Sequence, residues 1–179
     1  MPKRIFQYAL IFICAGILAL VQFSFVSGLP DPAQNFDLPI IAFIFAFLLM
    51  SRDRAWFLAG ATGWFLDAMS FHPFGISTLA LLGSAIIVYL VLENVFTNRS
   101  LYSFLLLAVI GITSEALISN ALMAVFDWQG AGGRFFLWSA GFWEGLAWSL
   151  LLGLVAIGLL FNLLAAVSRR LQPFFLKER

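Results

Sequence analysis

The chain has 179 residues and a net charge of +1, with 63% hydrophobic and 11% charged residues. A soluble domain is about half apolar and about a quarter charged, so a lipid bilayer is the expected solvent for this chain. The near-neutral charge leaves no basic surface for nucleic acid and excludes that class of partner. The one cysteine, Cys14, excludes an internal disulfide and a cysteine-rich metal site.

Six apolar runs follow one another along the chain, and each is predicted to be a transmembrane helix. The first, residues 5–27, is longer than the apolar core of a signal peptide, about 7–15 residues, and no clear cleavage site follows it. The second, residues 38–50, covers roughly 20 Å of a hydrocarbon core near 30 Å, so it could be re-entrant. The remaining runs are residues 55–69, 76–92, 101–126 and 135–167.

The distribution of basic residues indicates that all six runs cross. With six crossings, nine of the ten Lys and Arg residues fall on one side of the membrane. These nine are Lys3, Arg4, Arg52, Arg54, Arg99, Arg169, Arg170, Lys177 and Arg179. Cytoplasmic loops collect Lys and Arg, so both termini are expected in the cytoplasm and Arg134 alone outside. The predicted fold is an all-α integral membrane protein: one six-helix bundle over residues 1–168, then a basic cytoplasmic tail over 169–179.

Three acidic residues, Asp67, Glu115 and Glu144, lie inside the predicted spans, which contain no Lys or Arg. A charge at the bilayer centre costs about 2.5–3.5 kcal/mol on insertion scales, so such residues face protein or water. Counting residues from the span ends places all three in the outer-middle zone, where they could meet in one polar cluster. Three interpretations stay open: hydrogen-bonded acids that fix helix packing, a site for a partner or ligand, or catalysis.

Small residues at four-residue spacing predict helix faces that pack against protein. Ala55, Ala59 and Gly63 form such a stripe, and Asp67 is its next position, so this acid is expected to point at a neighbouring helix. The turn that follows contains Pro73 and Gly75, and glycine there supplies a permissive backbone. The other two stripes are Gly141, Gly145, Ser149 and Gly153 on the sixth run, and Ala15 and Ala19 on the first.

The segment "GWFLDAMSFHPFGISTLALLGSAIIVYL" resembles the bacterial rod-shape-determining membrane protein family, MreD, over residues 55–92. The residues that carry the resemblance are Gly63, Asp67, Pro73, Gly75 and Tyr89. It implies a non-enzymatic scaffold subunit of the lateral peptidoglycan-elongation complex in the bacterial cytoplasmic membrane. The implied partners are the bitopic shape protein MreC, wall-synthesising enzymes and actin-like filaments. Glu115 and Glu144 are outside the family pattern.

The alternative is a substrate-binding subunit of an energy-coupling-factor vitamin transporter, which the family also resembles. Ala15 and Ala19 would then serve as a docking face for a transporter partner, and the acids would line a ligand site. An enzyme is not expected, because the sequence has no G-x-S-x-G element, no phosphate-binding loop and no His-rich or Cys-rich set. No catalytic, cofactor-binding or metal-binding residue is therefore predicted.

Overall fold

The computed structural model describes residues 2–70, 73–94, 101–127 and 139–175, and every regular element within these ranges is helical. The elements are α1 (Pro2–Leu20), a π-helical turn η1 (Val21–Val26), a 3-10 turn η2 (Ala33–Asn35), α2 (Leu38–Leu49), α3 (Arg52–Met69), α4 (Ile76–Asn94), α5 (Leu101–Asp127) and α6 (Ala140–Phe175). The predicted all-α class is confirmed for these residues. The predicted start of the sixth run, residues 135–138, lies outside them.

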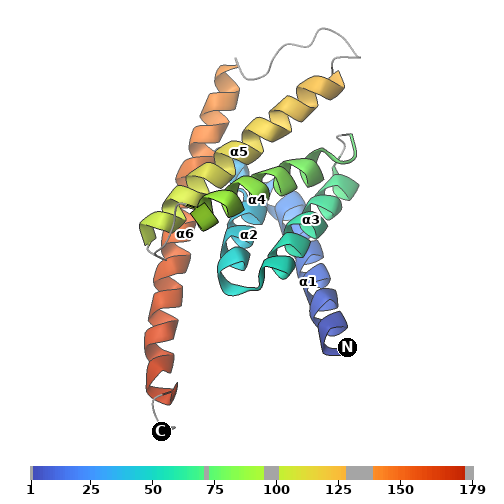
Figure 1. Cartoon of the computed structure of the whole chain (residues 1–179). Coiled ribbons are helices and arrows are strands. Elements are labelled where there is room, and N and C mark those ends of the chain that lie inside the picture. Colours follow the sequence, from blue (N-terminus) through green and yellow to red (C-terminus); the bar gives the residue numbers. More distant parts are fainter. Residues whose placement is uncertain (1, 71–72, 95–100, 128–138, 176–179) are drawn as a thin grey trace.

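The helix ends agree with the apolar runs to within a few residues, except at the C-terminal end. α6 continues to Phe175, so much of the segment predicted as a tail is helical. In Figure 1 the start of α1, the turn between α2 and α3, and the end of α6 all lie toward the lower part of the view.

Within the described residues, four helical segments are long and apolar enough to cross a membrane: Arg4–Val26, Ile76–Asn94, Tyr102–Val125 and Ala140–Leu163. α2 is too short for this criterion, since its 12 residues rise only about 18 Å. α3 begins with the charged residues Arg52, Asp53 and Arg54, which lower its hydropathy. Length and composition therefore identify a membrane protein with four candidate spans.

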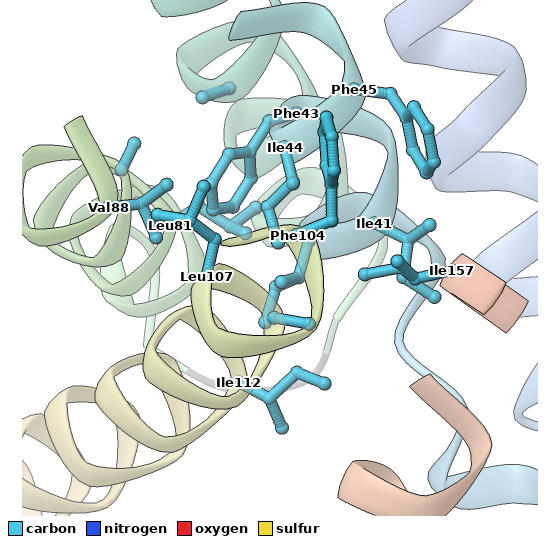
Figure 2. Close-up of a cluster of buried hydrophobic side chains, with 14 residues drawn as sticks. Ile41, Phe43, Ile44, Phe45, Leu81, Val88, Phe104, Leu107, Ile112 and Ile157 are labelled. Carbon is cyan, nitrogen blue, oxygen red and sulfur yellow. The ribbon is translucent and has the colours of Figure 1, made fainter. Parts of the chain in front are cut away.

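α2 lies at the centre of the helix packing. Asp37 caps it by accepting a hydrogen bond from the Ile40 N–H at 3.3 Å. Phe43 and Ile44 are each 1% exposed, and the Phe45 ring stacks on Phe104 of α5 with centroids 6.0 Å apart. A helix that is apolar on all sides is expected in a core, which is where this one lies. Figure 2 shows this cluster, to which α2, α3, α4, α5 and α6 contribute; its labelled residues are Ile41, Phe43, Ile44, Phe45, Leu81, Val88, Phe104, Leu107, Ile112 and Ile157.

A second cluster joins α1 to α3, which run side by side in Figure 1. Ala15 and Ala55 are fully buried there, and Ala19 of α1 is buried as well, with 0% of each residue exposed. The small residues of α1 are therefore used inside the chain. This finding contradicts their predicted role as a docking face for a transporter partner, because no surface of either residue is left for one.

The outward faces of the bundle are apolar. Leu151, Val155, Leu159 and Leu163 on α6 are each at least 51% exposed. In water such a continuous apolar face would be unfavourable, whereas lipid is its natural surroundings. These faces agree with the membrane location that the composition predicts.

Candidate functional site

Asp67 is bonded to the first turn of the neighbouring helix. Its carboxylate is 3% exposed and accepts from the Ser77 N–H at 2.8 Å and from the Thr78 N–H at 2.9 Å. The Thr78 hydroxyl donates a third hydrogen bond to the same carboxylate. The first N–H groups of a helix have no partner inside it, and a side chain at the N-cap usually supplies one. Gly75, which precedes α4, has no side chain, so Asp67 of α3 caps α4 in its place.

Gly63 allows the two helices to approach closely enough for this bond. A Cβ atom at this position would lie 2.6 Å from the Thr78 Cα and 3.2 Å from the Ser77 carbonyl oxygen. Gly63 and Asp67 are one helical turn apart on the same face of α3. The glycine contact and the carboxylate cap therefore act on the same turn of α4, and we call this arrangement the Asp67 clamp.

The turn before α4 and the far end of the α3–α4 hairpin contain the other residues of the family resemblance, Pro73, Gly75 and Tyr89. Gly75 has φ of 104°, a conformation that glycine adopts readily and other residues rarely do. Pro73 is exposed, and His72 lies outside the described residues. At the other end of the hairpin, Arg52 lies 3.4 Å from the Glu93 carboxylate and 4.7 Å from the centre of the Tyr89 ring. The two ends together hold α3 and α4 antiparallel.

The predicted orientation of the α3 stripe is confirmed, because Ala55, Ala59, Gly63 and Asp67 are all buried. The partners of the carboxylate were not predicted. The carboxylate oxygens accept mainly from backbone N–H groups. Every residue except proline has such a group, so the residue types in a sequence do not indicate which ones will be partners. The Gly at position 75, directly before an apolar helix with no N-cap side chain, was the one available hint.

Glu115, halfway along α5, lies in a different place. It lines a cavity of about 400 Å³ between α5, the start of α6 and η2. The other lining residues are Asn35, Ile112, Ala116, Ser119, Asn120, Ser139, Gly141, Phe142, Gly145, Leu146 and Ser149. No hydrogen bond or ion pair joins the Glu115 carboxyl to another described residue. An ionisable group inside a candidate span with an open cavity beside it is a candidate for binding.

Glu144 lines an adjoining cavity of about 320 Å³, together with Asp31, Gln34 and Trp148. The two cavities share Asn35, Gly141 and Gly145 as lining residues. Asp67 lines neither cavity and is instead bonded to α4. The single cluster of three acids that residue counting suggested is therefore not formed: Glu115 and Glu144 are near each other, and Asp67 belongs to the clamp.

The small residues of α6 pack as their spacing predicted, except at the first position. A Cβ at Gly145 would lie 3.4 Å from the Asn35 Oδ1, and one at Gly153 would lie 2.5 Å from the Ile112 Cδ1. The Ser149 hydroxyl donates to the Asn35 carbonyl oxygen. Gly141 has open space beside it and borders both cavities. The stripe thus packs α6 against η2 and α5, and the two cavities lie at its N-terminal end.

The loop between η1 and α2 holds polar residues that sequence reasoning missed. Gln22 of η1 donates to the Phe36 carbonyl oxygen at 2.9 Å and accepts from the Leu38 N–H at 3.0 Å, which fastens the end of this loop to η1. Asp37, which precedes α2 and is outside the four candidate spans, is close enough to Glu115 for their charges to repel. Burial raises the pKa of Asp37 to about 6, and its hydrogen bond with Ile40 opposes that rise.

No group of three or more His, Cys, Asp or Glu side chains able to hold a metal occurs in the described part of the chain. Comparisons with protein-family models, curated proteins and solved structures found no match to this chain. The function is therefore argued from the residues and the fold.

Proposed function

We propose that this protein is a six-span scaffold subunit of the bacterial cell-shape and peptidoglycan-elongation complex, as its resemblance to the MreD family implies. It would lie in the cytoplasmic membrane with both termini in the cytoplasm. An MreC-like bitopic protein would be its direct partner, within an assembly that includes wall-synthesis enzymes and actin-like filaments.

Six crossings are supported by charge as well as by geometry. α2 is a core helix, so protein rather than lipid surrounds it, and a short helix is tolerated there. The charged start of α3 follows directly after α2, where Arg52 and Arg54 are best placed in the cytoplasm. If α2 did not cross, these two residues would lie on the outer side and the sorting of basic residues would be lost.

The observation that carries the functional proposal is the Asp67 clamp. Gly63, Asp67 and Gly75 are residues on which the family resemblance rests, and all three have a structural role in one hairpin. The carboxylate is buried and fully engaged by three donors, so it presents no free group for a reaction. Residues that fix the geometry of a helical hairpin are expected in a scaffold protein, which acts by binding partners through a defined surface.

Depletion of the protein in its native rod-shaped cell tests this proposal. Cells should become round or swollen as the protein is lost, and the full chain should co-purify with a bitopic shape protein from solubilised membranes. Unchanged cell shape after depletion would contradict the proposal.

One observation favours the transporter alternative: the polar cavity beside Glu115 has a volume within the range of small-molecule sites, about 300–1,000 Å³. Against it, the α1 face formed by Ala15 and Ala19 is buried against the chain itself. Saturable vitamin binding by the purified protein, together with normal cell shape on depletion, would favour the transporter subunit over the scaffold.

A further inference from the structure

The cavity beside Glu115 is lined by three side chains that offer hydrogen-bond acceptors. The Asn120 side-chain amide donates to the Ala116 carbonyl oxygen at 2.8 Å, and that of Asn35 donates to the Pro32 carbonyl oxygen at 3.2 Å. No described residue donates a hydrogen bond to either amide oxygen. Both residues line the cavity with Glu115, whose carboxyl oxygens have no partner among the described residues.

Two of the donors near the cavity are already bonded within the chain. The Ser149 hydroxyl donates to the Asn35 carbonyl oxygen, and the Phe142 N–H at the start of α6 is bonded to the Ser139 hydroxyl at 3.2 Å. No lysine or arginine is found among the described residues that line either cavity. The unpartnered carboxyl and the two amide oxygens therefore favour a ligand that brings donors and positive charge.

We propose that this cavity binds a primary ammonium group, either of a small soluble amine or of an aminoethyl lipid headgroup. An ammonium group has three N–H donors and no acceptor, which is the complement of one carboxylate and two amide oxygens. Its charge would offset the repulsion between Glu115 and Asp37 and so favour binding in a site with few other counter-charges. The cavity of about 400 Å³ accommodates such a group with several atoms of its parent molecule.

The adjoining cavity provides the approach to this site. Glu144 and Trp148 line it and are exposed, with Trp148 38% exposed. A carboxylate attracts a cation from solvent, and an indole face stabilises one by about 0.5–1 kcal/mol at an exposed site. The ammonium group would therefore pass Glu144 and Trp148 before it reaches Glu115. This site is independent of the scaffold proposal, and its failure would leave that proposal intact.

The test uses the full chain in nanodiscs of phosphatidylglycerol, titrated with ethanolammonium while the melting temperature is followed. Ethylene glycol is the neutral control, and tetramethylammonium is the cationic control without N–H donors. The titration is repeated with Arg134→Gln, so that the chain's basic residue expected on the outer side cannot serve as the cation. Ethanolammonium should raise the melting temperature saturably, whereas neither control should.

The variants separate the site from general cation effects. Glu115→Gln should weaken ethanolammonium binding by about tenfold or more, since a hydrogen bond to a charged group contributes about 1.5–3 kcal/mol. Asn120→Ala, which keeps the net charge, should weaken it by a smaller factor of about three to ten. Glu93→Gln, at an exposed acid far along α4 from the cavity, should bind as wild type does.

A lipid arm identifies the source of the ammonium group. If phosphatidylethanolamine in the nanodisc competes with ethanolammonium, the ligand is a lipid headgroup; if it does not, the ligand is a soluble amine, and both results support the site. The proposal is overturned if ethanolammonium gives no saturable shift, if tetramethylammonium matches it, or if Glu115→Gln and Asn120→Ala both bind as wild type does.

Discussion

Replacing Asp67 with leucine removes the Asp67 clamp while keeping a side chain of similar size. The Ser77 and Thr78 N–H groups then face an apolar side chain in a buried position, and the Thr78 hydroxyl loses its acceptor. The helix hairpin of α3 and α4 should be destabilised, because α4 has no N-cap side chain of its own.

The magnitude follows from the two backbone groups. Each buried N–H left without a partner costs about 1–3 kcal/mol, and losing an anion at a helix N-terminus costs up to about 1 kcal/mol more. Asp67→Leu should therefore lower the free energy of unfolding by about 2–7 kcal/mol. Asp67→Asn should cost less, about 1–3 kcal/mol, because its oxygen still accepts one bond while its NH₂ group faces the other N–H.

The assay is the free energy of unfolding of the full chain, measured by steric trapping in a bilayer mimetic. Asp53→Asn is the matched control, because Asp53 is an exposed acid in the first turn of α3, and its loss should cost no more than about 1 kcal/mol. The loss of unfolding free energy should be largest for Asp67→Leu, smaller for Asp67→Asn and smallest for Asp53→Asn. Asp67→Leu with wild-type stability would refute the role of the clamp.

Two further predictions concern Gly63 and Asp37. Gly63→Ala should lower the free energy of unfolding by about 1–3 kcal/mol, because its Cβ would lie 2.6 Å from the Thr78 Cα and the helices would have to separate. Gly60→Ala, where the nearest atom would be a Leu82 methyl at 3.6 Å, should be neutral or stabilising, so equal effects at the two glycines would count against the close approach. For Asp37, a folded pKa of about 6 against 3.8 unfolded means that the folded state binds the proton more tightly, so stability falls as pH rises from about 4 to about 6. Thermal melting should show that Asp37→Asn, which keeps the cap on Ile40, loses part of this fall; an unchanged pH profile would argue against a buried Asp37.

The helices and the buried stripe of α3 could be predicted from the sequence because both depend on local patterns. Four-residue spacing of Ala55, Ala59 and Gly63 is enough to place Asp67 toward protein, whatever that protein is. The partner could not be predicted, because it is the backbone of α4, and which turn of α4 meets Asp67 depends on the geometry of the intervening loop.

The polar cavity shows a second limit of the same kind. Counting residues along helices estimates depth but not rotation, so it placed Asp67, Glu115 and Glu144 at similar heights and left their directions unknown. The structure turns Asp67 toward α4 and leaves Glu115 and Glu144 beside the loop that precedes α2. Asn35, which lines both cavities, and Asp37, which is close to Glu115, come from the segment before α2, where no periodic pattern indicates which side chains turn inward.

The crossing of all six helices is the central claim, and cysteine accessibility in intact cells tests it most directly. Single cysteines are placed at Gly28, Ser51, His72 and Asn98 in a Cys14→Ala background, because Cys14 is exposed and would react. A membrane-impermeant thiol reagent should label positions 28 and 72 in intact cells, and positions 51 and 98 only after the membrane is opened. Labelling of positions 28 and 51 from the same side would contradict the account, because α2 would then not cross.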